Sequence, residues 1–262
     1  MPNPIVIKIG GALLAEATTL DDFWPAVRAL QETAPVVIVH GGGPQATAMA
    51  RRLGHEPRIV HGRRVTSDLD LDIMQWTVRG AINVQLVGQA IRQGIRAVGL
   101  SGADGGLLRV TRRPPWQVDG ETVDFGWVGD VDHANTDVLD ALLGSSFLPI
   151  IAPLGIDSEG AIYNVNADTV ARTLAEALNA SQFLLVTESG GVRRDPDNAD
   201  SLLDACSRAT FEAGKTDGWI QGGMRVKLQV AFEALAAGIP DVFILAPGDL
   251  MTRRRATQVL DA

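Results

Sequence analysis

A lysine and two glycine clusters stand where a chain could hold phosphate. Lys8 lies near the end of the apolar run "IVIKI", and Gly10 and Gly11 follow it at once. A second apolar run, "PVVIVH", leads into Gly41-Gly42-Gly43 and then into a helical pattern. Backbone N–H groups at such a strand-to-helix junction bind anions, and the positive end of the helix dipole assists them. We therefore expect an anion site here, with a plain tight turn as the alternative for the glycines.

Polar residues also gather at the start of two helical patterns further along the chain. In "NVNADTVARTLAEAL", helix capping accounts for Asn166, and the helix dipole favours Asp168 in the first turn, but neither explains Asn164. Lys227 follows Gly222-Gly223 early in another helix. A lone lysine on a helix is usually a solvated surface charge, so Lys227 by itself leaves both readings open.

Six apolar runs predict the elements that position these residues. They are "PIVIKIG", "PVVIVHG", "IRAVGLSG", "FLPIIAPLG", "SQFLLVTESG" and "DVFILAPG", and helical patterns separate most of them. Runs that are apolar at every position are typical of strands covered on both faces. The sequence thus predicts an α/β three-layer sandwich, with a central, mainly parallel sheet between helix layers. Lys8 then points into the crevice at the carboxyl ends of the strands, unless it reaches water at an edge.

Three local patterns complete the expected organisation. Residues 107–127 predict a β-hairpin excursion that turns at Asp119-Gly120. Residues 67–92 predict one long helix capped by Ser67. The segment "EALNAS" predicts a boundary between residues 1–178 and residues 179–262.

Composition excludes several classes of function. The 262-residue chain has a formal net charge of −8, which argues against nucleic acid or an anionic membrane as a partner. Its single cysteine, Cys206, excludes an internal disulfide and a cysteine-based zinc site. Residues 1–9 do not look like a signal peptide, and no apolar run approaches the roughly 18 residues of a membrane span. We expect a cytoplasmic location.

Seven segments, in this order, resemble the amino acid kinase family over nearly the whole chain. They are "KIGGALL", "VHGGGPQ", "HGRRVT", "GLSGADGGLL", "DFGWVGDVDHANTDVL", "LPIIAPLGIDSEGAIYNVNAD" and "GGMRVK". The resemblance implies ATP-dependent phosphorylation of the side-chain carboxylate of an N-acylated glutamate, by default N-acetylglutamate, in arginine biosynthesis. It implies ATP and Mg²⁺ as cofactors, with the Mg²⁺ carried by ATP rather than by a protein metal site.

By the same resemblance, Lys8 and Lys227 neutralise charge on the moving phosphoryl group, and Asp168 holds the two lysines. The N-terminal lobe, residues 1–178, binds the acyl amino acid and forms the dimer, while residues 179–262 bind the nucleotide. The substrate-binding residues are Gly42, Gly43, Arg64 and Asn164, and the phosphate- or nucleotide-binding residues are Gly10, Gly11, Thr187, Glu188 and Gly190. No general base is needed, because a carboxylate acceptor is already ionised at neutral pH.

The chain departs from the family at two places. Thr187-Glu188 stands where members usually have Thr-Asp or Ser-Asp, which leaves a non-catalytic regulatory member of the fold as one alternative. Arg63 stands next to Arg64 where an apolar residue is usual, and the small residues Ala46, Thr47, Ala48 and Ala50 follow the glycine triplet. Small residues and an extra cation favour a larger or carboxylate-bearing acyl group such as succinyl. Alternatively, the alanines pack against a differently shaped neighbour and Arg63 lies in solvent.

Two further expectations concern the substrate and the assembly. A kinase acting on aminoadipate linked to a small carrier protein is a second enzymatic alternative, for which "RRPP" and "TRRRA" supply basic residues. The weakly charged face of residues 67–92 predicts pairing with a second copy, hence a homodimer. Arginine-inhibited members have an additional N-terminal helix, whereas here the first strand begins almost at Met1, so we expect insensitivity to arginine.

Overall fold

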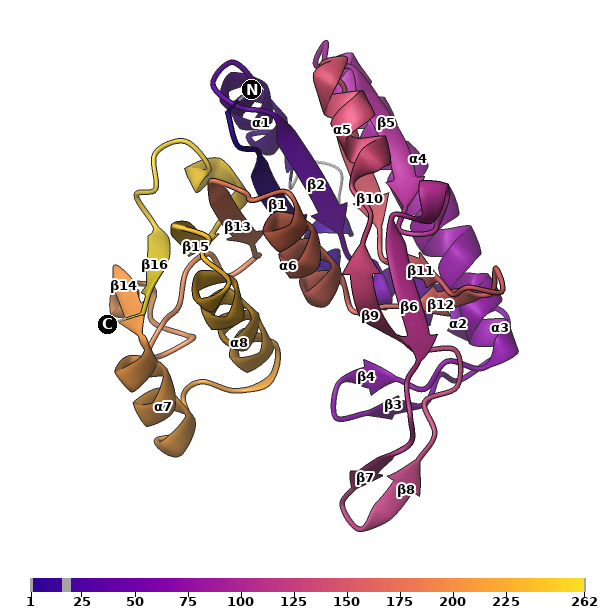
Figure 1. The fold of residues 1–262 in the computed structure, drawn as a ribbon. Helices are drawn as coiled ribbons and strands as arrows, with labels where there is room; N and C mark the ends of the chain where they lie inside the picture. Colours follow the sequence, from indigo (N-terminus) through magenta and orange to yellow (C-terminus); the bar gives the residue numbers. More distant parts are fainter. Residues whose placement is uncertain (1, 16–19, 262) are drawn as a thin grey trace.

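The computed structural model describes residues 2–15 and 20–261 and has a single large sheet at its centre. Its eight strands follow the order β14-β16-β15-β13-β1-β2-β10-β5 (Figure 1). All neighbouring pairs are parallel except β15 and β16. The strands are β1 (Ile5–Ile9), β2 (Val36–His40), β5 (Ala97–Ser101), β10 (Leu148–Ala152), β13 (Gln182–Val186), β14 (Ala205–Ser207), β15 (Asp241–Leu245) and β16 (Ala256–Leu260).

The six predicted strands are confirmed, and they occupy six consecutive places in this sheet. Every residue of β1, β2 and β10 is buried, as expected for strands covered on both faces. The strands β14 and β16 were not predicted. β14, at the edge of the sheet, has only the three residues "ACS", and its neighbour β16, "ATQVL", contains two polar residues, so neither forms a continuous apolar run.

Helices cover both faces of the sheet, so the predicted three-layer sandwich is confirmed (Figure 1). On one face Ile5, Ile7 and Ile9 of β1 share a core with the first helix and with the end of the long helix. On the other face Val6 shares a core with the helices over residues 137–144, 167–177, 208–216 and 222–236. The helices are α1 (Phe23–Gln31), α2 (Gly43–Arg52), α3 (Asp68–Met74), α4 (Asn83–Arg92), α5 (Asp137–Gly144), α6 (Ala167–Ala177), α7 (Arg208–Thr216) and α8 (Gly222–Ala236).

The predicted helix over residues 67–92 is continuous but contains an unexpected π-helical segment. It runs through α3, the π segment η3 (Gln75–Ile82) and α4. Ser67 caps it as predicted, because its hydroxyl accepts from Asp70 N–H and the Asp70 carboxylate accepts from Ser67 N–H. The wider π turn is not visible in the apolar pattern.

Two hairpins and a small second sheet extend from the large sheet. The small sheet has the order β12-β11-β6-β9, and the hairpins are β3–β4 and β7–β8. The hairpin turn predicted at Asp119-Gly120 is confirmed, since both residues have positive φ (51° and 84°), as a two-residue type I′ turn requires. The strands are β3 (Ile59–Val60), β4 (Arg63–Arg64), β6 (Leu108–Arg112), β7 (Trp116–Val118), β8 (Glu121–Val123), β9 (Gly129–Ala134), β11 (Leu154–Ile156) and β12 (Ile162–Asn164).

The proposed boundary at residue 178 falls between α6 and β13, in the middle of a shared sheet. β13 pairs with β1 along its whole length, so the large sheet continues across both halves of the chain. The division into two lobes therefore remains a prediction about function. Short 3₁₀ helices link the other elements: η1 (Gly11–Leu14), η4 (Asp104–Gly106), η5 (Ala199–Ser201) and η6 (Pro247–Asp249). Within residues 2–15 and 20–261, every helix is too short or too polar to cross a membrane.

Candidate active site

A buried ion pair joins the first strand to the helix that follows β12. Lys8 Nζ lies 2.8 Å from Asp168 Oδ1, and the two residues are only 5% and 8% exposed. Asn166 caps α6 as predicted, since its side-chain oxygen accepts from the N–H groups of Asp168 and Thr169. The Lys8–Asp168 contact is close in distance, but its angles are not those of a hydrogen bond, so it is an ion pair. Lys8 is thus not an edge lysine that reaches water.

Lys227 lies on α8, across from this pair, and is half-buried. Its Nζ donates to the carbonyl oxygen of Gly223, 3.3 Å away. Burial lowers the pKa of Lys227, the nearby charge of Lys8 lowers it further, and the charge of Asp168 opposes both effects. The three groups therefore interact electrostatically, as expected of residues that act on one anion. Lys227 is not a fully solvated surface charge.

The glycine clusters fit closely against each other and against the long helix. A Cβ atom on Gly11 would lie 3.0 Å from the backbone nitrogen of Gly42, and one on Gly41 would lie 3.0 Å from that of Gly11. A Cβ atom on Gly42 would lie 2.8 Å from Val78 of the π segment. Only Gly43 has open space on that side. Packing between the two loops thus requires most of these glycines, in addition to any ligand.

Three of the glycine N–H groups remain available to a ligand. The N–H of Gly10 donates to Val186 O (3.1 Å) and extends the β1–β13 ladder, so this group is already used. Within residues 2–15 and 20–261, the N–H groups of Gly11, Gly42 and Gly43 donate no hydrogen bond. Gly43 is the first residue of α2, so these donors lie at the positive end of its dipole.

His40, which precedes the glycine triplet, is fully buried and neutral. Its Nδ1 donates to the carbonyl oxygen of Gly41 (2.8 Å), and its Nε2 accepts from the Asn83 amide (3.0 Å). Asn83 donates in turn to Ile150 O on β10. Burial lowers the pKa of His40 from 6.5 to about 4, the Gly41 hydrogen bond partly opposes this, and Arg79 adds to the lowering.

This imidazole makes stability depend on pH in a defined direction. The unfolded chain binds a proton below pH 6.5 that the folded chain binds only below about 4. The contribution of His40 to the free energy of unfolding is therefore complete above pH 6.5 and falls by about 1.4 kcal/mol per pH unit as the pH decreases towards 4. The His40→Asn variant, which keeps a donor near the Nδ1 position, should lack this slope in chemical unfolding at pH 7, 5.5 and 4.5. Equal slopes for both proteins would contradict the prediction.

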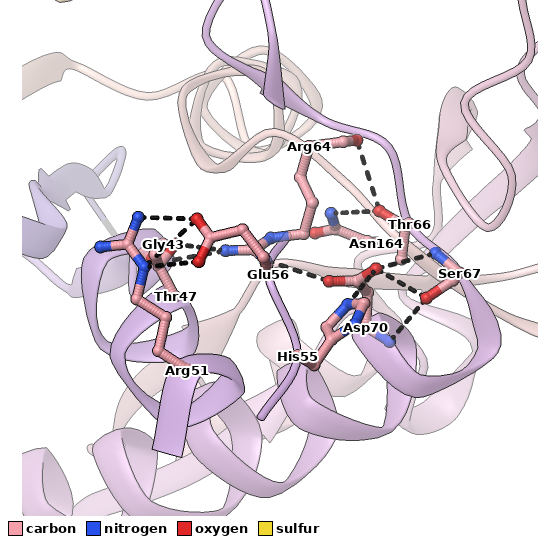
Figure 2. A network of polar contacts seen from close by, with 10 residues as sticks. All are labelled: Gly43, Thr47, Arg51, His55, Glu56, Arg64, Thr66, Ser67, Asp70 and Asn164. Atoms are coloured by element: carbon pink, nitrogen blue, oxygen red, sulfur yellow. Dashed lines mark hydrogen bonds and ion pairs between the residues drawn. The ribbon is translucent and has the colours of Figure 1, made fainter. Parts of the chain in front are cut away.

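Arg64 is held rigidly at the rim of the glycine loop (Figure 2). Its Nη1 donates to Asp70 Oδ1 (3.1 Å), and its Nη2 donates to Thr47 Oγ1 (2.7 Å) and Gly43 O (3.3 Å). Burial would raise the pKa of Asp70, but hydrogen bonds from Ser67 and Arg64 and the close contact with His55 outweigh it and lower the pKa. The guanidinium is thus fixed before any substrate binds.

A cavity of about 250 Å³ brings most of the predicted residues together. Its lining contains Lys8, Gly11, Gly42, Gly43, Arg64, Asn164 and Asp168. The Asn164 amide donates to Thr66 Oγ1 (3.1 Å), which fixes its orientation (Figure 2). The lining also contains Arg113, which no motif in the sequence marks as a site residue apart from the basic "RRPP" segment.

The small residues after the glycine triplet do not widen this cavity. Ala46 and Ala50 are fully buried and pack against Ile73, Met74 and Val78. Thr47 binds Arg64, and none of the four residues named for this role lines the cavity. The prediction of an enlarged pocket at these positions is wrong, because Ala46 and Ala50 pack towards the long helix, as the alternative had it, while Ala48 is exposed. Arg63, in contrast, does line the cavity.

The predicted nucleotide residues lie elsewhere, on the C-terminal half. Thr187 is buried, and its hydroxyl donates to Gly190 O (2.6 Å), so it closes the turn. Glu188 and Gly190 line a cavity of about 160 Å³ together with Arg193. A neighbouring cavity of about 390 Å³ shares Arg193 and is lined by Ser189, Gly191, Pro196, Gly218, Trp219, Gln221 and Met224. The described residues contain no group of three or more His, Cys, Asp or Glu placed to hold a metal ion.

Comparison with known proteins assigns the chain to a family. A profile of the Amino acid kinase family matches residues 3–246. The chain belongs to the amino acid kinase family. An acetylglutamate kinase of Anaeromyxobacter sp. (strain K) is 44% identical over 261 residues, covering 94% of this chain and 93% of that protein.

Two solved structures place this amino acid kinase among proteins of the same fold. The structure of smu.665 from Streptococcus mutans UA159 matches with a TM-score of 0.84 at 26% identity, over 100% of both chains. Carbamate kinase from Giardia lamblia bound to AMP-PNP matches with a TM-score of 0.68 at 15% identity, over 99% of both chains, which is a likeness of fold alone.

Proposed function

We propose that this amino acid kinase transfers the γ-phosphoryl group of ATP to the side-chain carboxylate of an N-acylated glutamate. N-acetylglutamate is the default acceptor, as the name of the relative at 44% identity indicates. The observation that carries the proposal is the Lys8–Asp168 pair beside Lys227 and the available glycine N–H groups. Arg64 and Asn164 line the same cavity and suit the α-carboxylate and the acylamino group of the acceptor.

The residues present match the needs of this reaction. A carboxylate that attacks a phosphate brings two anions together, so catalysis depends on positioning and charge neutralisation. An acceptor oxygen bonds to the γ-phosphorus as the bond to ADP breaks, and ADP leaves with that electron pair. Lys8, Lys227 and the N–H groups of Gly11, Gly42 and Gly43 stabilise the charge on the phosphoryl oxygens. Asp168 orients the lysines and keeps the pair of cations together.

The donor side is assigned to the C-terminal half. Trp219 and Met224 offer an apolar wall for a base, and Arg193 offers a cation for phosphates, in the cavity of about 390 Å³. We propose that Mg²⁺ enters with ATP, whose phosphate oxygens are its preferred ligands. The assignment of Thr187, Glu188 and Gly190 to nucleotide binding also remains a proposal, as do a cytoplasmic location and a role in arginine biosynthesis.

A hydroxylamine trap tests the proposed function. Purified protein with ATP, Mg²⁺ and N-acetylglutamate should yield a hydroxamate, because hydroxylamine captures the acyl phosphate product. Free glutamate, which lacks the acylamino group, is the control acceptor and should react far less. ATP consumption without hydroxamate, or no reaction with any N-acylglutamate, would contradict the proposal and favour a regulatory member of the fold.

We also propose that the protein is a homodimer joined through the long helix. Exposed apolar side chains recur about every two turns along the long helix: Leu69, Trp76, Val84 and Ile91. The last three are more than half exposed (57%, 62% and 57%). An unpartnered apolar stripe of this length on one helix is suited to a copy of itself around a two-fold axis.

Charge on this stripe should separate the subunits. The Val84→Glu variant is expected to move from dimer to monomer in light scattering at micromolar concentration, because two carboxylates would be buried in a symmetric interface. Met251→Glu, at another exposed apolar position (50%), is the control and should leave the mass unchanged. A wild-type monomer, or a dimeric Val84→Glu variant, would disprove this interface.

A further inference from the structure

Three guanidinium groups line the candidate acceptor cavity, and their local charges do not balance. Arg64 is paired with Asp70. Arg113, which follows β6 and is buried, is paired with Asp130, since its Nη2 and Nε lie 2.6 and 3.0 Å from Asp130 Oδ1. Arg63 has no such carboxylate partner among residues 2–15 and 20–261, although it is partly buried and lines the same cavity.

Stacking on a single indole holds the two additional guanidinium groups in place. The Arg113 Cζ atom lies 4.4 Å from the centre of the Trp116 ring, and the Arg63 Cζ atom lies 5.0 Å from it. Trp116 is fixed by an edge contact with the buried ring of Phe125, at 5.4 Å between centres. The β3–β4 and β7–β8 hairpins therefore cooperate to fix both groups, so these are not freely moving surface arginines.

This arrangement has an electrostatic cost in the free protein. Burial lowers the pKa of Arg63, and the positive charge of Arg113 lowers it further, while Asp130 partly compensates. Two like charges held beside one indole gain most from an anion that both can reach. A carboxylate matches the planar donor fork of a guanidinium.

The carboxylates of the default acceptor have other partners. Its side-chain carboxylate must lie near Lys8 and the glycine N–H groups in order to react, and its α-carboxylate is assigned to Arg64. Its acetyl group is neutral and offers nothing to Arg63 and Arg113. A third carboxylate, at the end of the acyl group, would supply the missing negative charge.

We propose that the preferred acceptor is a glutamate whose N-acyl group ends in a carboxylate, such as succinyl, and that Arg63 and Arg113 bind that carboxylate. The inference rests on the proposed function, because it assigns the acyl end of the same acceptor site. It does not depend on the alanines after the glycine triplet. Arg63 and Arg113 set the specificity for the acyl group, whereas Lys8 and Lys227 serve the reacting end.

Three acceptors distinguish the effect of a terminal charge on the acyl group from the effect of the length of that group. N-succinylglutamate carries the terminal carboxylate, N-butyrylglutamate has an acyl chain of the same length without it, and N-acetylglutamate has the short chain. We expect kcat/KM for the succinyl compound to exceed that for the butyryl compound by about 10- to 100-fold, as for a charged hydrogen-bonded contact. Equal values for these two compounds would overturn the proposal.

Substitutions test which arginines bind the terminal carboxylate of the acyl group. Arg63→Met and Arg113→Met should each reduce the succinyl-to-butyryl ratio towards one, while kcat/KM for N-acetylglutamate changes by only a few fold. Arg112→Met is the matched control, since Arg112 neighbours Arg113 but pairs with Asp124 on the exposed surface and does not line the cavity. If Arg63→Met lowered kcat/KM equally for all three acceptors, Arg63 would be a second ligand of the α-carboxylate and the proposal would be wrong.

Calorimetry keeps this test independent of turnover. N-succinylglutamate should bind the folded wild-type protein more tightly than N-butyrylglutamate, and Arg63→Met should remove the difference. Tight, charge-dependent binding without hydroxamate formation would disprove the kinase reaction but preserve the anion preference. Hydroxamate formation with no preference for the succinyl compound would support the kinase reaction and disprove the anion preference.

Discussion

The Lys8→Ala variant is expected to lower kcat for acyl phosphate formation by about 10²- to 10³-fold, the usual effect of removing one preorganised electrostatic donor. The Michaelis constants should change little, because the charge of Lys8 matters most when phosphoryl charge spreads in the transition state. Stability should also fall, since the variant leaves the Asp168 carboxylate buried without a cation. Breaking a buried pair in this way costs about 3–5 kcal/mol.

The Lys227→Ala variant separates catalysis from stability. It should lose a similar factor in kcat, but its unfolding transition should stay nearer to that of the wild type, because among residues 2–15 and 20–261 Lys227 forms no ion pair within 4 Å and its hydrogen bond goes to the Gly223 carbonyl. Lys215→Ala on the neighbouring helix α7 is the control, since Lys215 pairs with Glu212 at the surface. If either active-site variant changed only a Michaelis constant, the catalytic role of that lysine would be wrong.

The Arg64→Ala variant is expected to raise the Michaelis constant for the acyl amino acid by about 10- to 100-fold, the effect of losing a charged hydrogen-bonded contact. Arg64→Lys should restore little of this loss. A lysine ammonium group cannot bond to Asp70, Thr47 and Gly43 at once, as the planar guanidinium group of Arg64 does. The Michaelis constant for ATP should remain near its wild-type value in both variants.

A nearby arginine provides the control for this experiment. Arg51 also pairs with a carboxylate, Glu56, but both side chains are exposed, and neither lines the cavity (Figure 2). Arg51→Ala should therefore leave the kinetics unchanged. An Arg64→Ala enzyme with a normal Michaelis constant for the acceptor and a reduced kcat would move Arg64 from substrate binding to catalysis.

The sequence alone was sufficient wherever the signal is local. Six strands could be predicted because each forms a nearly continuous apolar run, and most of their residues are buried. The caps at Ser67 and Asn166 and the turn at Asp119-Gly120 could be predicted because capping and positive φ depend on one or two residue types. The anion site was indicated by glycines and lysines at strand ends, and the family resemblance then supplied roles for Lys8, Lys227 and Asp168.

Tertiary structure decided every feature that depends on residues distant in the chain. The edge strand β14 and its neighbour β16 lack a continuous apolar pattern, and they are strands because the sheet offers them partners. The N–H group of Gly10 donates a hydrogen bond to the carbonyl oxygen of Val186, which is more than 170 residues away in the chain. No local sequence pattern reveals this bond. Ala46 and Ala50 of α2 point to the long helix rather than to the cavity, because the packing of these helices sets which face is covered.

The position of Arg113 shows the same limit most clearly. In the sequence it is one of two arginines in "RRPP", 50 residues from Arg63 and without any pattern that connects them. The two hairpins bring both guanidinium groups to Trp116 and to one cavity. Sequence determined that an anion is handled at the strand ends, because residue types and turns are local properties. Only the folded chain determined how many cations meet there, because electrostatic balance depends on distances in space.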